Sequence, residues 1–96
     1  IAYFQDAVEY AKMGLVPAGT YKNRGYSIGS VDAQGIEEFY LDLLYDPQTS
    51  GGLLIAAPAA DVDELTRRLD AEGRIAAVVG RVCEPVSGGP AVHVVR

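Results

Sequence analysis

Cysteine and histidine are almost absent from this sequence, and their scarcity excludes several kinds of chemistry. The single cysteine, Cys83, cannot form a disulfide within the chain, which fits a reducing, cytoplasmic setting. It ends an apolar stretch without a neighbouring histidine or a CxxC partner, which predicts a buried small hydrophobe rather than a nucleophile. The single histidine, His93, alternates with two valines, which predicts an exposed strand residue rather than a metal ligand or base.

Positive charge and long hydrophobic runs are also scarce. The chain has eight Lys and Arg residues and 13 Asp and Glu residues, so its net charge is -5. This balance argues against nucleic acid or an anionic membrane as a partner, because both reward clustered Lys and Arg. The apolar runs are all shorter than the roughly 18 to 20 residues that a membrane span needs, so no span is expected.

The length and the periodicity of the apolar residues predict one α+β domain. The 96 residues are 49% hydrophobic, which allows a packed core. The chain opens on Ile1 inside an expected helix, so residues 1–96 are expected to be a single, partial domain of a longer protein. Helical spacing predicts helices at 1–13 (with Gly14 as its C-cap), 36–46 and 58–72 (ended by Gly73).

Short apolar runs predict the strands of this domain. Residues 53–57 form a continuous apolar run, typical of a strand buried on both faces. Residues 75–83 and 91–95 are expected to be two further strands, joined by the loop 84–90 as a β-hairpin. The order of elements predicts an α+β fold with a mixed or antiparallel sheet and packed helices.

The glycine-rich stretch 15–35 has no clean periodicity and is predicted to be an ordered loop. Its centre, "GTYKNRG", places Lys22 and Arg24 next to Thr20 and Asn23. Basic, hydroxyl and amide groups together suit an anion such as a phosphate. A solvated surface loop remains an equal alternative on the residues alone.

A second polar stretch, "DPQTSGG" at 46–52, separates two apolar segments. Gln48, Thr49 and Ser50 offer neutral donors and acceptors, and Gly51 and Gly52 offer backbone N–H groups that a ligand can approach closely. The stretch lacks the GK[ST] of a Walker loop, and a strand rather than a helix is expected to follow it. A binding loop and a tight helix-to-strand turn are equally open.

Two ordered stretches, "MGLVPAGTYKNR" and "LLYDPQTSGGLLIAAP", together resemble the selenophosphate synthetase (selenide, water dikinase) family. The resemblance covers essentially all 96 residues and is to the later part of the family's C-terminal domain. Ala18 departs from the pattern, where a second glycine is frequent. The resemblance implies a domain of the aminoimidazole ribonucleotide synthetase-like type, paired in the full-length enzyme with an N-terminal ATP-binding domain and forming a homodimer.

The resemblance also implies an activity. Family members convert ATP, selenide and water to selenophosphate, AMP and phosphate with Mg²⁺, and the selenophosphate supplies selenium for selenocysteine synthesis. Their reactive Cys or Sec and their metal-binding aspartates match nothing in this chain. The chain alone is therefore expected to be inactive, with no catalytic or metal-binding residue and no bound ATP or Mg²⁺.

The matching motif positions give the expected site residues. In the full-length enzyme we expect them near the ATP phosphates, in the cleft between the domains, with Lys22 and Arg24 as candidates for charge support. The expected site residues are Thr20, Asn23, Gln48, Thr49, Ser50, Gly51 and Gly52.

Three alternatives stay open on the sequence. The chain could be a non-catalytic αβ module that binds a small ligand or drives oligomerisation. It could come from a relative in the same superfamily with another substrate. Lacking neighbouring strands, it could also expose a sheet edge and pair with a second copy.

Overall fold

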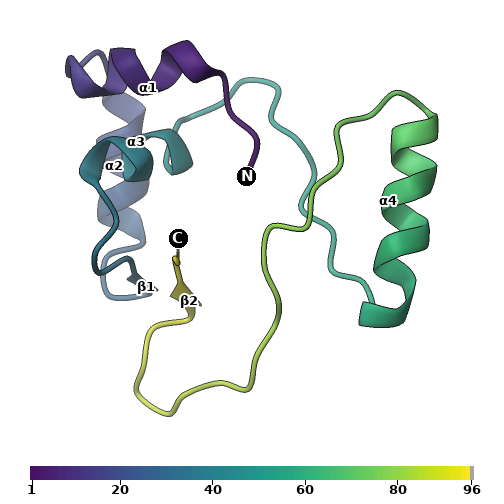
Figure 1. Ribbon diagram of the computed structural model, residues 1–96. Helices are drawn as coiled ribbons and strands as arrows, with labels where there is room; N and C mark the ends of the chain where they lie inside the picture. Colours follow the sequence, from purple (N-terminus) through teal and green to yellow (C-terminus); the bar gives the residue numbers. More distant parts are fainter. Residues whose placement is uncertain (96) are drawn as a thin grey trace. The chain divides into compact units, whose positions relative to one another are not determined.

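The computed structural model describes residues 1–95 and consists of two compact units, which are described separately. The first, here the α1–α3 unit, contains Tyr3–Thr49 and the chain from Cys83 onward. The second, here the α4 unit, contains Ile1–Ala2 and Ser50–Val82. Figure 1 shows the helices and strands of each. The described residues hold four α-helices and one two-stranded sheet, so the predicted α+β class is confirmed.

Helix α1, Gln5–Lys12, forms where helical spacing predicts it and buries Val8 and Ala11. Gly14, with φ +76°, follows the C-cap and donates its N–H to the Ala11 carbonyl. The N–H of Leu15 reaches the Tyr10 carbonyl, which completes a Schellman motif. The predicted glycine stop of this helix is thereby confirmed.

Helix α2, Ala18–Tyr26, lies inside the stretch that the sequence predicts to be a loop, so that prediction is wrong. Gly19 and Gly25 lower the helix propensity of this segment by about 1 kcal/mol each relative to alanine, and this hides the helix from a local analysis. Contacts with the end of α3 outweigh that cost. The expectation that the stretch is ordered and lies against another segment is confirmed.

Helix α3, Glu38–Leu44, confirms the helix predicted at 36–46 with shorter ends. It packs against α1, and Leu41 joins Val8 and Ala11 as the buried apolar residues of this unit. The rings of Phe39 and Tyr40 lie 4.6 Å apart in a tilted arrangement, and the ammonium of Lys12 lies over the Phe39 ring. Tyr45 is the C-cap, and Pro47 prevents the helix from continuing.

The sheet consists of β1, Val31–Asp32, and β2, Val92–His93, which are parallel with Asp32 opposite His93. The predicted C-terminal β-hairpin and the antiparallel or mixed sheet are therefore wrong for residues 1–95. β2 pairs with a segment about 60 residues earlier in sequence rather than with 75–83 (Figure 1). His93 is half exposed on its strand, as predicted, and its Nδ1 lies 3.3 Å from Asp32 Oδ2.

The α4 unit holds a short 3₁₀ turn, Ala59–Asp61, followed by α4, Val62–Ala71. The predicted pairing of Glu64 with Arg68 is confirmed at 2.7 Å, and Arg67 adds a second contact at 2.8 Å. Hydrogen bonds from Arg68 and then Arg67 lower the pKa of the Glu64 carboxyl. Gly73, at φ +67°, ends the helix as predicted.

Residues 53–57 and 75–83 belong to no helix or strand, so both strand predictions are wrong for this structure. Leu53 and Leu54 are exposed rather than buried on both faces. Cys83 is exposed as well, which corrects its prediction as a buried hydrophobe. A strand needs neighbours to satisfy its backbone groups, and the described residues supply none to these two segments.

Candidate functional site

The two sequence motifs meet within the α1–α3 unit. Gly19, in the first turn of α2, lies so close to Pro47 that a β-carbon at position 19 would stand 2.8 Å from Pro47 Cγ. That is well inside van der Waals contact for two carbon atoms. Glycine is thus required at this position for the motif "VPAGTYKN" to lie against "DPQT".

Two hydrogen bonds join the same two segments. The side-chain amide of Asn23 donates from Nδ2 to the carbonyl of Tyr45 at 2.9 Å. The hydroxyls of Ser27 and Tyr45 are hydrogen-bonded, also at 2.9 Å. Both contacts fall at the C-terminal end of α3, where backbone carbonyls lack partners within their own helix. The chain is therefore fixed where it leaves α3 and enters the "DPQTSGG" stretch.

Arg24 is balanced by acidic groups. Its Nη1 lies 2.9 Å from Glu38 Oε1 and 3.6 Å from Asp42 Oδ1, both on α3. Asp42 is largely buried, so this ion pair also tethers α2 to α3. Lys22, on the same helix, is exposed. Of the two cations expected to support a phosphate, Lys22 is the one whose position leaves it open to an incoming anion.

Thr20 is fully buried, in contrast to the other predicted site residues. Its Oγ1 has no hydrogen-bond partner among the described residues. A buried hydroxyl without a partner costs free energy, because folding removes its bonds to water. In this structure Thr20 contributes its methyl group to packing, and its hydroxyl is closed to ligands.

Gln48 and Thr49 are exposed and belong to the α1–α3 unit, whereas Ser50, Gly51 and Gly52 are exposed and belong to the α4 unit. The N–H of Gln48 bonds to the carbonyl of Asp46 at 2.9 Å and forms a tight turn around Pro47. The structure therefore brings Thr20, Asn23, Gln48 and Thr49 together with α2 in one unit, and it does not place the last three motif residues with them.

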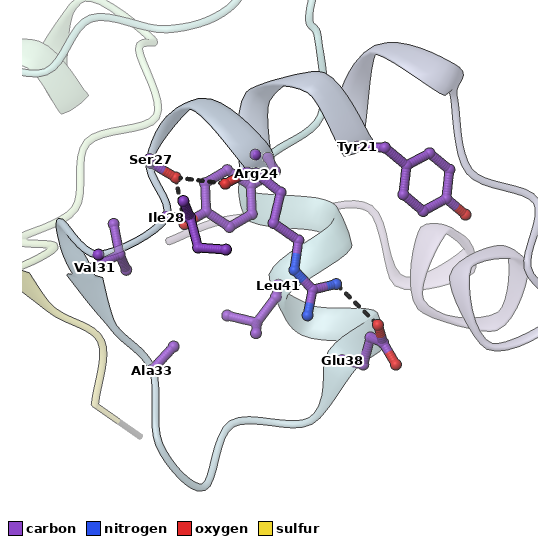
Figure 2. Close-up of a pocket in the computed structure, with 11 residues that line it drawn as sticks. Tyr21, Arg24, Ser27, Ile28, Val31, Ala33, Glu38 and Leu41 are labelled. Carbon is purple, nitrogen blue, oxygen red and sulfur yellow. Dashed lines mark hydrogen bonds and ion pairs between the residues drawn. The ribbon is translucent and has the colours of Figure 1, made fainter.

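An open cavity of about 540 Å³ lies between α2, β1 and α3. Figure 2 shows the guanidinium of Arg24 extending across it toward Glu38, with Ile28, Val31 and Leu41 on its apolar side. Ser27 and Tyr45 also line it. Of the predicted site residues, only Arg24 is part of this lining.

Sequence reasoning missed four residues of this arrangement, namely Gly19, Ser27, Tyr45 and Pro47. The sequence did contain a signal for one shared helix face, because Gly19, Asn23 and Ser27 are spaced four apart. That spacing aligns residues on one face only if the segment is helical. The loop prediction for 15–35 concealed it.

Within residues 1–95, no group of three or more His, Cys, Asp or Glu side chains could hold a metal ion. None of the helices of residues 1–95 is long and apolar enough to cross a membrane.

Curated proteins with similar sequences decide the family. The selenide, water dikinase of Caldanaerobacter subterraneus subsp. tengcongensis is 45% identical over 85 residues, or 88% of this chain. That of Pelobacter propionicus is 44% identical over 86 residues, again 88% of the chain. Selenide, water dikinase 2 of Peptoclostridium acidaminophilum is 43% identical over 83 residues, or 85% of the chain. The chain belongs to the selenide, water dikinase family.

The match covers only part of these relatives. The chain spans about a quarter of their length, 24% to 25% in these three cases. No family model and no solved structure matches it. The selenide, water dikinase family is thus established by sequence, and the role of this segment within it rests on the contacts described above.

Proposed function

We propose that this chain is a segment of a selenophosphate synthetase, which makes selenophosphate from ATP, selenide and water and releases AMP and phosphate. In this proposal the full-length enzyme is a homodimer, and an N-terminal domain holds ATP, Mg²⁺ and the reactive groups. The identity of 43% to 45% with three selenide, water dikinases supports it. In the same proposal the reactive groups lie in that N-terminal domain, so this chain alone would be inactive.

The segment's own role would be to border the phosphates of ATP. The observation that carries this is the packing of the two motifs on each other through Gly19 with Pro47 and Asn23 with Tyr45. Gln48 and Thr49 follow Pro47 and are exposed, and Ser50, Gly51 and Gly52 continue the same motif along the chain. Amide, hydroxyl and backbone N–H donors can fix phosphate oxygens and exclude water. Lys22 would add positive charge.

The test replaces Thr49 in the full-length enzyme and measures selenide-dependent AMP formation. Thr49→Ala removes the hydroxyl and is expected to lower kcat/KM at least tenfold, since one donor to a transferring phosphoryl group contributes on this order. Thr49→Ser retains the hydroxyl and is expected to stay within about twofold of the natural enzyme. Equal activity of Thr49→Ala and the natural enzyme would contradict the proposal.

A further inference from the structure

Two residues of α2 and its C-cap, Ser27, lie in one row and all contact the segment that begins at the C-cap of α3. Gly19, Asn23 and Ser27 are spaced four apart, which sets them in a row along the helix. We infer that this row, here named the α2 latch, positions residues 45–49 for ligand binding. The inference rests on the proposed function, because it explains how the segment proposed to border the ATP phosphates is held in place.

The latch makes a different contact at each of its three levels. At the first, the missing side chain of Gly19 admits the ring of Pro47. At the second, Asn23 donates to the carbonyl of Tyr45. At the third, the hydroxyl of Ser27 bonds to that of Tyr45. Steric fit, a backbone bond and a side-chain bond thus fix the same short segment from one helix face.

Asn23 acts through this segment rather than by direct contact with a ligand. Its Nδ2 is engaged by the carbonyl of Tyr45, the C-cap of α3, at 2.9 Å. A carbonyl at a helix end needs a partner from outside the helix, and the Asn23 amide supplies it. Asn23 and Ser27 are therefore positioning residues, and Thr49 is the nearby residue whose exposed hydroxyl faces the ligand in the proposed function.

Gly19 offers the sharpest test because α2 contains a matched control. A methyl group at Gly19 would meet Pro47 Cγ at 2.8 Å and Cβ at 3.0 Å, while one at Gly25 would meet nothing within 4 Å. Both changes add the same methyl group to the same helix and raise its helix propensity equally. Only Gly19→Ala forces α2 and Pro47 apart.

The experiment compares Gly19→Ala, Gly25→Ala, Pro47→Gly and the double variant Gly19→Ala/Pro47→Gly in the full-length enzyme, at a temperature where all are folded. Amide hydrogen exchange of residues 45–49 and the kcat and KM for ATP are measured. We expect Gly19→Ala to speed exchange of this segment and to lower kcat/KM for ATP, each about tenfold, because sub-ångström displacements of positioning groups are costly. Gly25→Ala should change neither.

The double variant distinguishes loss of the contact between Gly19 and Pro47 from a general loss of structure. Pro47→Gly removes the ring atoms that the new methyl would strike, so adding Gly19→Ala to it should cost less than twofold further. A full additional tenfold loss in the double variant overturns the inference, as does exchange at 45–49 that is equal in Gly19→Ala and Gly25→Ala. Faster exchange in Gly19→Ala with unchanged kinetics upholds the latch and instead contradicts the proposed role at the phosphates.

Discussion

At the residue scale, the motif side chains divide into those that hold the structure and those that remain open to a ligand. Asn23 is engaged at the end of α3, and Arg24 is balanced by Glu38 and Asp42. Thr49 and Lys22 are exposed. The sequence could identify all four as polar motif residues, but it could not separate these roles. Which polar groups become satisfied internally depends on neighbours that are distant in sequence.

Thr20 gives a direct test of this division. Replacing Thr20 by valine removes the buried hydroxyl that has no partner within residues 1–95, while keeping a branched side chain of similar size. We expect Thr20→Val to raise the free energy of unfolding of the chain by about 1 kcal/mol in a urea titration. Thr49→Val, at an exposed position, should change it by less than about 0.5 kcal/mol. A loss of stability in Thr20→Val would mean that the hydroxyl is hydrogen-bonded.

At the scale of elements, α1, α3 and α4 follow from helical spacing and from their stop signals, and α2 does not. Gly14 and Gly73 end their helices as local sequence predicts. Helix α2 contains two glycines, and it exists because Gly19 lets it lie against Pro47. The strand predicted at 53–57 does not form, because an apolar run specifies a strand only when neighbouring strands are present. Local rules therefore predicted the elements that need no distant partner.

Helix α4 should show a pH dependence that originates in Glu64. Its pKa is lowered from 4.5 by Arg68 and Arg67, so the folded helix holds the charged form more strongly than the unfolded chain does. The stabilisation is complete above about pH 4.5 and is lost as the pH falls through the lowered pKa.

Circular dichroism of the chain between pH 6 and pH 2 measures this loss, with pH values chosen to bracket the usual carboxyl range. The natural chain should lose helicity more steeply than Glu64→Gln, whose side chain cannot titrate. Asp70→Asn, which removes a carboxylate from the same helix but leaves the Glu64 pairs intact, should retain the steep loss. Identical profiles for the natural chain and Glu64→Gln would rule out this origin.

At the scale of the whole molecule, the chain exposes several apolar segments. Leu53, Leu54, Ile75 and Val82 are each at least 86% exposed. Strand-forming runs of this kind normally pair with neighbours. The relatives are about four times as long as the matched region, so the full-length enzyme proposed above would have further chain to supply such neighbours.

Cys83 reports whether residues 75–83 gain strand partners in the full-length enzyme. In the chain its thiol is exposed, so a thiol reagent should label it rapidly. In the full-length enzyme we expect the peptide containing Cys83, followed by mass spectrometry, to be labelled at least tenfold more slowly. The denatured forms of both proteins should react at the same rate. Equal labelling of the two native proteins would mean that 75–83 stays uncovered.

The pairing of β1 with β2 sets an order on the formation of the α1–α3 unit. Asp32 and His93 are separated by 61 residues, and closing a loop of that length costs about 3.7 kcal/mol from the length term alone. A backbone hydrogen bond returns only about 1 kcal/mol. During synthesis, helices α1 to α3 emerge long before β2 does. Most of this unit can therefore assemble on the ribosome, but its sheet forms only when Val92–His93 has been made.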